Sequence, residues 1–354
     1  MKTKVIKVEE DQIDEDVIEE AARIIQEGGL VSFPTETVYG LGANGLDEEA
    51  VSKIFKAKGR PQDNPLILHI SDLDELDQLV SEIPDQARIC MDKFWPGPLT
   101  LIFKRSSLVP DAITAGLETV AIRMPSDKIA RALIRKSKRP IAAPSANTSG
   151  KPSPTAAEHV YRDLNTRLEM IIDGGRTGIG LESTVLDLTE DVPTILRPGG
   201  ITYEDLREVL GEVRIDKSIV SLDKNIIPKS PGQKYRHYAP NSDMYIYEGE
   251  LEAVVEAISR RAQEEDAAGR KVGIMATDET RASYEGARYE GARVYSMGSR
   301  KAEAEIAHNL FSILREMDRE EVDIILAESV DFSSMGLAIM NRMTKAAGGR
   351  IIKA

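Results

Sequence analysis

The chain has 354 residues and a formal net charge of -13, from 46 basic and 59 acidic side chains. Its length suits two domains, each large enough to bury a hydrophobic core. A hydrophobic share of 41% and a charged share of 30% exclude a disordered chain. The acidic balance argues against the broad basic face that nonspecific nucleic-acid binding requires.

The sequence shows no sign of membrane insertion or export. No run of about 18 apolar residues occurs, so we expect no membrane-spanning segment. The N-terminus, MKTKVIKVEEDQIDE, soon turns acidic and lacks the apolar core of a signal peptide, so the expected compartment is the cytoplasm. Cys90 is the only cysteine, which predicts neither a disulfide nor a zinc site. We interpret it as a small buried hydrophobic residue.

Helical and strand patterns alternate along the first 210 residues. Apolar spacing predicts a helix over 14–28 that ends at Gly28 and Gly29. Further helical patterns cover 47–57, 72–82, 126–137, 154–165 and a short stretch after RPGG. The short apolar runs that predict buried strands are LVSF, PLILHI, LTLIF, TVAIRM, IAAPS, MIID and STVLDL. This alternation indicates a mixed α/β domain.

The pattern weakens over 211–242, which predicts a linker. Flexible linkers favour small polar residues, whereas this one contains KYRHYAP, so we expect the segment to be bound to something. The remainder predicts a smaller α/β domain, with strands at MYIYEG, KVGIMAT, ARVYSMG and DIILAES and helices over 250–265, 302–317 and 336–347. No G-x-G-x-x-G or Walker loop follows these strands, which favours a scaffold, lid or regulatory role.

Basic residues gather in KAKGRPQDNPL. Lys58 and Arg60 flank Gly59 at the end of the predicted helix over 47–57, where cations complement the helix dipole. Pro61 and Pro65 then fix the path of the chain, which suits a site for a polyanion such as a triphosphate. The neighbouring Lys56 is interpreted as helix surface.

Arg123 lies inside the apolar run TVAIRM. A buried guanidinium needs an anionic partner because an unpaired buried charge is costly. The partner is either a protein carboxylate, which is the usual case, or a substrate carboxylate held bidentately. His69 in PLILHI, taken alone, is typical of a satisfied core residue.

Neutral hydrogen-bonding groups gather in several loops. VSFPTETVYGLGANG combines Thr35 and Thr37 with glycines that permit close approach to a ligand, although a tight turn explains it equally well. IAAPSANTSGKPSPT is dense in hydroxyl and amide groups that suit phosphate oxygens. LESTVLDL and ILRPGG place Ser183 and Arg197 at strand ends. Without a Ser-His-Asp set, paired carboxylates or H-E-x-x-H, this inventory favours phosphoryl or nucleotidyl transfer over hydrolysis.

Taken together, PTETVYGLG, KAKGRPQDNPL, PSAN, STV, RPG and SPGQKYRHYAP resemble the threonylcarbamoyl-AMP synthase family. The resemblance is strong over about residues 10–210 and the linker; beyond them it rests on length and layout. It implies a YrdC-like catalytic domain over 1–210, with a twisted mixed sheet and a concave, positively charged cavity. A linker or lid over 211–242 and a Rossmann-like domain over 243–354 would follow.

The resemblance also implies a reaction, in which L-threonine, bicarbonate or CO2, and ATP give L-threonylcarbamoyladenylate and pyrophosphate. This is the first step towards N6-threonylcarbamoyladenosine in tRNA. Mg2+ would accompany ATP, held largely by phosphate oxygens and water, with no dedicated protein metal site. We expect a monomer that passes its product to the tRNA threonylcarbamoyl transferase machinery, without a membrane or a stable nucleic-acid partner.

Carried over to this chain, the family's site falls on residues from many segments. Lys58 and Arg60 would be catalytic, because they would neutralise charge on the leaving phosphates. Threonine would be bound by Thr37, His69, Arg123, Ala143 and Ser183. ATP would be bound by Lys58, Arg60, Asn64, Thr119, Ser145, Asn147, Ser153, Arg197, Tyr235 and His237. Arg236 would join Tyr235 and His237 in the lid.

Three alternatives stay open. A double-stranded RNA or tRNA-binding protein would grip phosphates in the same cavity, but the acidic charge counts against it. Carbamoyl transfer to hydrogenase-maturation partners requires zinc-finger-like segments, which a single cysteine cannot supply. A structural factor with a vestigial site is disfavoured by the intact set of cations and hydroxyls.

Overall fold

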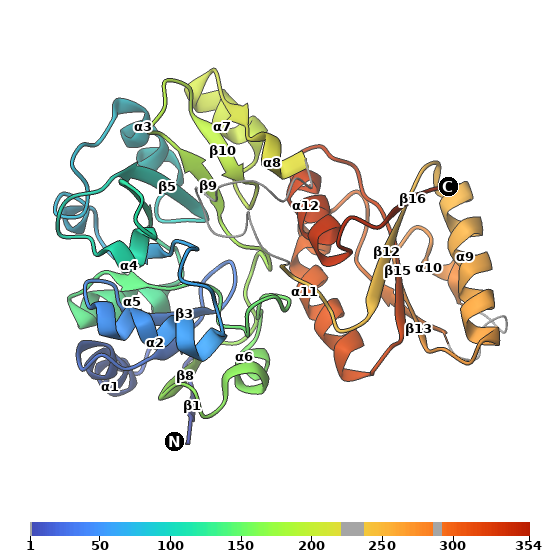
Figure 1. The fold of residues 1–354 in the computed structure, drawn as a ribbon, viewed down its shortest axis with the longest axis horizontal. Coiled ribbons are helices and arrows are strands. Elements are labelled where there is room, and N and C mark those ends of the chain that lie inside the picture. The colour runs from blue at the N-terminus through green and yellow to red at the C-terminus, as the bar shows by residue number, and fades with distance from the viewer. Residues whose placement is uncertain (1, 221–236, 286–291) are drawn as a thin grey trace. The chain divides into compact units, whose positions relative to one another are not determined.

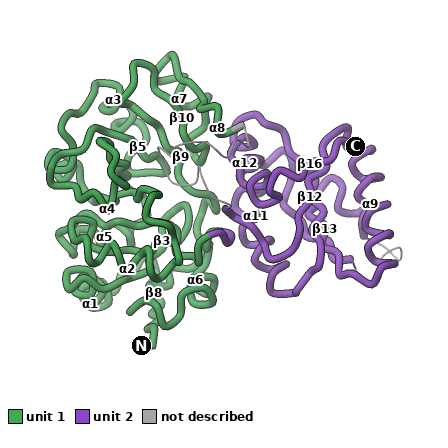
Figure 2. The backbone as a smooth tube through the Cα atoms, viewed as in Figure 1, with its two compact units in different colours: residues 1–149, 153–235 green, residues 150–152, 236–354 purple. Residues whose placement is uncertain are grey.

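The structure is a computed structural model that describes residues 2–220, 237–285 and 292–354. It divides into two compact units (Figure 2). Unit 1 comprises residues 1–149 and 153–235, and unit 2 comprises residues 150–152 and 236–354. Among the described residues, no helix is both long and apolar enough to span a bilayer.

A mixed sheet runs through unit 1 (Figure 1). Among the described residues it has eleven strands in the order β1-β8-β2-β3-β7-β4-β6-β5-β9-β10-β11, with parallel and antiparallel neighbours. The strands are β1 (Lys4–Lys7), β2 (Val31–Phe33), β3 (Gly40–Asn44), β4 (Ile67–His69), β5 (Leu99–Lys104), β6 (Thr119–Arg123), β7 (Ile141–Ala142), β8 (Met170–Asp173), β9 (Thr184–Asp187), β10 (Thr194–Arg197) and β11 (Arg214–Ile215). The predicted mixed α/β class is confirmed.

Several helices of unit 1 begin at capping residues that the sequence supplies. The side chain of Asp47 accepts from the first turn of α2 (Glu48–Lys58), and Gly59 ends that helix in a left-handed conformation with φ 62°. Because glycine adopts this conformation without strain, the chain turns sharply between Lys58 and Arg60. The other helices are α1 (Glu15–Gln26), η1 (Leu73–Glu75), α3 (Asp85–Phe94), α4 (Asp111–Thr114), α5 (Lys128–Ser137), α6 (Ala157–Leu164), α7 (Tyr203–Leu210) and α8 (Lys217–Val220).

The helix predicted over 72–82 is wrong, because η1, one 3-10 turn, is the helical structure found there. The carboxylate of Glu75 accepts hydrogen bonds from the backbone of Ser71 (2.9 Å) and Asp72 (3.1 Å), which tightens the turn. Val80 then forms a β-bridge with Arg105, so the chain is drawn towards the sheet before an α-helix can continue.

Hydrophobic residues on the central strands alternate between the two faces of the sheet. Leu68, Leu101 and Ile122 belong to the main core of unit 1. The opposite face carries a smaller apolar cluster of Ile67, Ile102, Ala121, Val185 and Leu196. His69 and Arg123 stand two positions beyond Ile67 and Ala121, so their side chains point to this second face. One face of the sheet therefore packs into the main core, and the opposite face carries the polar side chains of His69 and Arg123.

Cys90 lies on α3 with its side chain buried, and it forms no disulfide. Burial raises the pKa of its thiol to about 12, so the thiolate is not formed at physiological pH. The interpretation of Cys90 as a small buried hydrophobic residue is confirmed.

Unit 2 contains a parallel sheet, with the strand order β14-β13-β15-β12-β16 among its described residues. Its strands are β12 (Asp243–Glu248), β13 (Val272–Ala276), β14 (Ala292–Ser296), β15 (Ile324–Glu328) and β16 (Ile351–Lys353). Its helices are α9 (Leu251–Ala267), α10 (Arg281–Tyr284), α11 (Glu303–Arg319) and α12 (Gly336–Ala346). The parallel sheet with intervening helices agrees with the predicted Rossmann-like arrangement.

The boundary between the units is more complex than a single linker. Within the predicted linker 211–242, residues 214–220 form β11 and α8 of unit 1, and residues 221–236 lie outside the described residues. Inside unit 2, the short segment 150–152 is held by hydrogen bonds from the later part of the chain. The backbone of Ala239 donates to Gly150 O (2.8 Å), and Arg315 Nη2 donates to Pro152 O (2.5 Å).

Replacing Leu101 with alanine should lower the free energy of unfolding of unit 1 by about 2 to 5 kcal/mol, because the substitution leaves a cavity in the core. Trp95, the only tryptophan, is buried in unit 1, so its fluorescence during a urea titration reports the transition. Leu108→Ala is the control, because that side chain is 46% exposed and should cost less than about 1 kcal/mol. Equal losses in both variants would contradict the assignment of the core.

Candidate functional site

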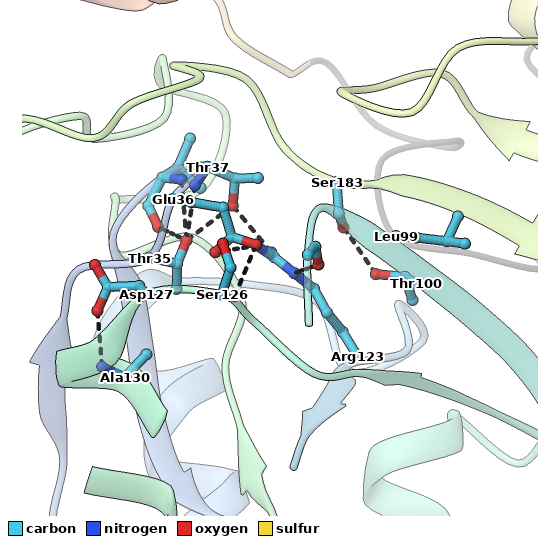
Figure 3. Close-up of polar contacts among 12 residues, drawn as sticks. Thr35, Glu36, Thr37, Leu99, Thr100, Arg123, Ser126, Asp127, Ala130 and Ser183 are labelled. Atoms are coloured by element: carbon cyan, nitrogen blue, oxygen red, sulfur yellow. Dashed lines mark hydrogen bonds and ion pairs between the residues drawn. The ribbon is translucent and has the colours of Figure 1, made fainter. Parts of the chain in front are cut away.

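Arg123 is the buried cation at the centre of the site (Figure 3). Its Nε donates to Gly97 O (3.3 Å), and its Nη1 donates to Thr37 Oγ1 (2.9 Å). Nη2 lies 2.8 Å from Glu36 Oε2, yet in the described part of the chain neither atom makes an aligned hydrogen bond. A guanidinium has more N–H donors than these contacts use. The cation is therefore neutralised while some of its donors stay available for a ligand.

The PTETVYG segment carries Glu36 and Thr37 to Arg123. The hydroxyl of Thr35 donates to Val38 O (2.7 Å), so the Thr37 hydroxyl, 2.8 Å away, donates to Thr35 and can accept from Arg123. Glu36 is anchored separately, because its Oε1 accepts from the backbone of Ser126 (3.2 Å). The tight turn that the sequence left open is therefore present, and the role of this loop in ligand binding stays a prediction.

Strand register places His69 and Thr100 on either side of Arg123. His69 pairs with Arg123 across β4 and β6, and Thr100 pairs with it across β5 and β6. His69 is buried, and within the described structure its Nδ1 has no hydrogen-bond partner. Burial, followed by the charge of Arg123, lowers the pKa of His69 to about 3. The imidazole is therefore neutral at physiological pH.

The STV and RPG motifs form one hydrogen-bonded group beside Thr100. Ser183 Oγ lies 2.7 Å from Thr100 Oγ1 (Figure 3). Arg197 donates through Nε to Ser183 O (3.0 Å) and through Nη2 to Ser183 Oγ (3.1 Å). A Cβ on Gly199 would lie 2.3 Å from the backbone nitrogen of Thr184, so this close packing requires glycine.

Lys58 organises the PSAN loop. Its side chain is buried, and its Nζ donates to Ser145 O, to Asn147 O (2.7 Å) and to Asn147 Oδ1 (3.4 Å). Ser145 Oγ donates to the same Asn147 Oδ1 (2.6 Å). In this structure the Lys58 ammonium bonds to the loop carbonyls and thereby fixes the shape of the PSAN loop.

Arg60 folds the KGRPQDNP loop back on itself. Its Nη2 donates to Asn64 O (3.3 Å) and Pro65 O (3.0 Å). The Asn64 side chain is buried, and among the described residues its Oδ1 has no hydrogen-bond partner. A buried amide oxygen without a partner is costly in a protein alone, so Asn64 is well placed to bond a ligand.

The short central strands separate the predicted residues into two groups. Thr37, His69, Arg123, Ser183 and Arg197 lie towards the carboxyl ends of β4 and β6 or bond to groups there. Towards the start of these strands lie Lys58, Arg60, Asn64, Thr119, Ser145 and Asn147. Thr119 and Arg123 are the two ends of β6, which corresponds to about 13 Å at the rise of a strand. The two groups therefore lie towards opposite ends of the same strands.

The remaining residues predicted to belong to the site lie in different structural environments. Ser153 is buried and donates to the carboxylate of Glu182. Ala143 is buried beside β4, where its backbone donates to Ile67 O (3.1 Å). His237 is partly buried and belongs to unit 2, and Tyr235 and Arg236 lie outside the described residues. The lid assignments therefore stay predictions.

Sequence reasoning missed Glu36, Thr100 and Glu182. Glu36 had a signal, because a buried arginine most often has a protein carboxylate as its partner and Glu36 stands next to Thr37. Thr100 is the polar residue within the apolar run LTLIF, and Glu182 precedes Ser183. The described residues contain no group of three or more His, Cys, Asp or Glu side chains that is able to hold a metal ion.

Asp127 adds a further carboxylate near Glu36. Its Oδ1 accepts from the backbone of Ala130 (2.8 Å) at the start of α5 (Figure 3). Burial raises the pKa of Asp127 to about 7, and the charges of Glu10 and Glu36 contribute to the rise. Near pH 7 the Asp127 carboxyl is therefore only partly ionised.

This fold and site define a two-unit α/β protein whose first unit contains a cluster of buried cations and hydroxyl groups. A family model described as "Telomere recombination" matches residues 23–199, and one described as "Threonylcarbamoyl-AMP synthase, C-terminal domain" matches residues 201–348. The chain belongs to the threonylcarbamoyl-AMP synthase family, which confirms the resemblance seen in the sequence.

Known relatives cover both units. A threonylcarbamoyl-AMP synthase of Pyrococcus abyssi is 51% identical over 354 residues, which is 99% of each chain. One of Bacillus subtilis is 51% identical over 338 residues, covering 95% of this chain and 94% of its own. The crystal structure of P. abyssi Sua5 complexed with L-threonine superposes with a TM-score of 0.93 at 50% identity, covering 99% of this chain and 100% of that chain.

Replacing Asp127 with asparagine should change how stability depends on pH. An exposed aspartate titrates at about 3.9, below the value of about 7 in the folded protein. The wild type is therefore stabilised by the bound proton at low pH and loses this contribution as pH rises through 7. Asparagine keeps an oxygen for the cap but cannot ionise. In urea titrations, stability of the wild type relative to Asp127→Asn should fall between about pH 4 and 7; a difference independent of pH would refute this.

Proposed function

We propose that this protein forms L-threonylcarbamoyladenylate and pyrophosphate from L-threonine, bicarbonate or CO2, and ATP. Full-length similarity to relatives named threonylcarbamoyl-AMP synthase carries this proposal. The product is the activated precursor of N6-threonylcarbamoyladenosine, so we propose that a tRNA threonylcarbamoyl transferase consumes it. A cytoplasmic location and a monomeric state stay predictions of the sequence.

L-threonine is proposed to bind at the carboxyl ends of β4 and β6. The unused N–H donors of Arg123 suit its carboxylate, because guanidinium and carboxylate form paired hydrogen bonds. Neutral His69, whose buried Nδ1 has no hydrogen-bond partner among the described residues, is proposed to bond to the threonine hydroxyl. Ala143 and Ser183 are proposed to complete this pocket. The threonine complex of the P. abyssi relative supports the same ligand here.

ATP is proposed to bind mainly towards the start of these strands. Lys58, Arg60 and Arg197 would supply positive charge for the phosphates. The neutral groups proposed to contact ATP are Asn64, Thr119, Ser145, Asn147 and Ser153, joined from the lid by Tyr235 and His237.

Mg2+ is proposed to enter with the triphosphate. Mg2+ prefers oxygen ligands, keeps several waters, and is commonly bound through a carboxylate and substrate phosphates. Glu182, a buried carboxylate beside Ser153, and the unpaired Asn64 Oδ1 are oxygens of this kind. They fit a role as supplementary ligands, and the ion would supply charge neutralisation at the phosphates.

In the proposed reaction, the threonine nitrogen adds to the carbon of CO2 to give a carbamate, with loss of protons to solvent. A carbamate oxygen then attacks the α-phosphorus in line, and the bond to pyrophosphate breaks. The cations would offset charge that grows on the leaving phosphates, and the PSAN loop held by Lys58 would keep them in position. Exclusion of water would protect both the carbamate and the adenylate.

The direct test is pyrophosphate release from Mg-ATP and bicarbonate, with L-threonine, L-serine, L-valine or no amino acid. Release that requires both bicarbonate and L-threonine is expected, because the site has groups for a carboxylate and a hydroxyl. No release under any condition, together with RNA binding that weakens steeply with salt, would favour the RNA-binding alternative.

Lys58→Ala should reduce turnover by about 100-fold or more, because the lysine both shapes the PSAN loop and supplies charge at the phosphates. The dissociation constant of L-threonine should change by less than about threefold. Lys58 lies towards the start of β4 and β6, whereas the residues proposed to bind threonine lie towards the carboxyl ends of these strands. Lys56→Ala, on the exposed face of the same helix, is the matched control and should leave both values unchanged. An unchanged turnover number for Lys58→Ala would contradict the catalytic role proposed for Lys58.

A further inference from the structure

Neutralisation of the Arg123 charge does not fully explain the position of the Glu36 carboxylate. Its Oε2 is buried 2.8 Å from Arg123 Nη2 without the alignment of a hydrogen bond. Its Oε1 accepts one bond, from the backbone of Ser126 (3.2 Å), on the exposed side of the group. A carboxylate oxygen has capacity for more than one hydrogen bond. Glu36 thus keeps acceptor capacity next to the guanidinium, as Arg123 keeps donor capacity (Figure 3).

A free α-amino acid presents matching charges, because its carboxylate and its ammonium are attached to the same carbon. A ligand whose carboxylate bonds to Arg123 brings its ammonium close to any acceptor that already touches that guanidinium. Among the described residues, Glu36 provides the carboxylate that forms an ion pair with Arg123.

We propose that Glu36 receives the α-ammonium of the amino-acid substrate through Oε1, so that Arg123 and Glu36 together select a zwitterion. Glu36 is then a specificity-determining residue that touches the substrate, in addition to the residues assigned by the family resemblance. This inference rests on the proposed function, since it takes the amino acid to be bound at Arg123.

The competing explanation is that Glu36 only compensates the buried charge of Arg123. Loss of the Glu36 charge would then make Arg123 more attractive to every carboxylate ligand. The two explanations differ for a ligand without an ammonium group. The probe is 2,3-dihydroxybutanoate, which has the threonine skeleton with a hydroxyl in place of the amine.

The experiment is calorimetric titration of each ligand into the full-length protein without ATP, at about pH 8 so that Asp127 is ionised. The wild type should bind L-threonine at least about tenfold more tightly than 2,3-dihydroxybutanoate. Glu36→Gln should weaken L-threonine binding by about 10- to 100-fold, because a hydrogen bond between charged groups is lost. The same variant should bind 2,3-dihydroxybutanoate as tightly as the wild type or more tightly. Equal shifts for both ligands would overturn the proposal.

Two further variants control the measurement. Glu36→Asp keeps the charge and should retain part of the preference for L-threonine. Asp127→Asn removes a neighbouring carboxylate that bonds to Ala130, so it should change the ratio of the two affinities by less than about threefold. If Trp95 fluorescence shows that Glu36→Gln does not fold, the ratios of the wild type and Glu36→Asp decide. A wild type that binds neither ligand contradicts the proposed function, whereas one that binds both equally contradicts this inference alone.

Discussion

A charged guanidinium inside a sheet has to be compensated, and the arrangement of unit 1 around Arg123 follows from that requirement. Arg123 ends a central strand, where neighbouring strands supply backbone and hydroxyl groups but no carboxylate. The compensation comes from Glu36, on a loop between two other strands of the sheet. Folding of that loop is thus tied to the chemistry of the site, because Glu36 and Thr37 are bonded to the residue they help to position.

The second requirement is that a sheet with polar and charged groups on one face must gain its stability from packing on the other face. Strand alternation meets it, because Leu68, Leu101 and Ile122 pack into the main core while their neighbours point to the opposite face. On that face the small cluster of Ile67, Ile102, Ala121, Val185 and Leu196 is flanked by polar residues at the ends of the strands.

Local patterns in the sequence predicted most helices and strands. The spacing of apolar residues indicates which face of an element is buried, and a glycine often marks the residue at which a helix ends. They failed over 72–82, where the bonds of Glu75 override an apparently helical spacing. The sequence also did not indicate β3, since GLGAN has few of the apolar side chains that identify a strand. For the site, the motifs identified Arg123 and Lys58 as functional candidates. They did not predict the contact between Glu36 and Arg123 or the hydrogen bonds from Lys58 to the PSAN loop. Those depend on strand order and loop closure, which no local pattern contains.

The segment 150–152 changes how far the two units can be treated as separate modules. It belongs to unit 2, although the chain on either side of it belongs to unit 1. Its carbonyl groups at Gly150 and Pro152 accept bonds from Ala239 and Arg315. A fragment that ends before residue 236 would keep these carbonyls and lose their donors, and the loop between Asn147 and Ser153 would lose that support. Loss of activity in such a fragment would therefore not show that unit 2 contains a catalytic group, because the cut itself alters a segment between two proposed ATP contacts.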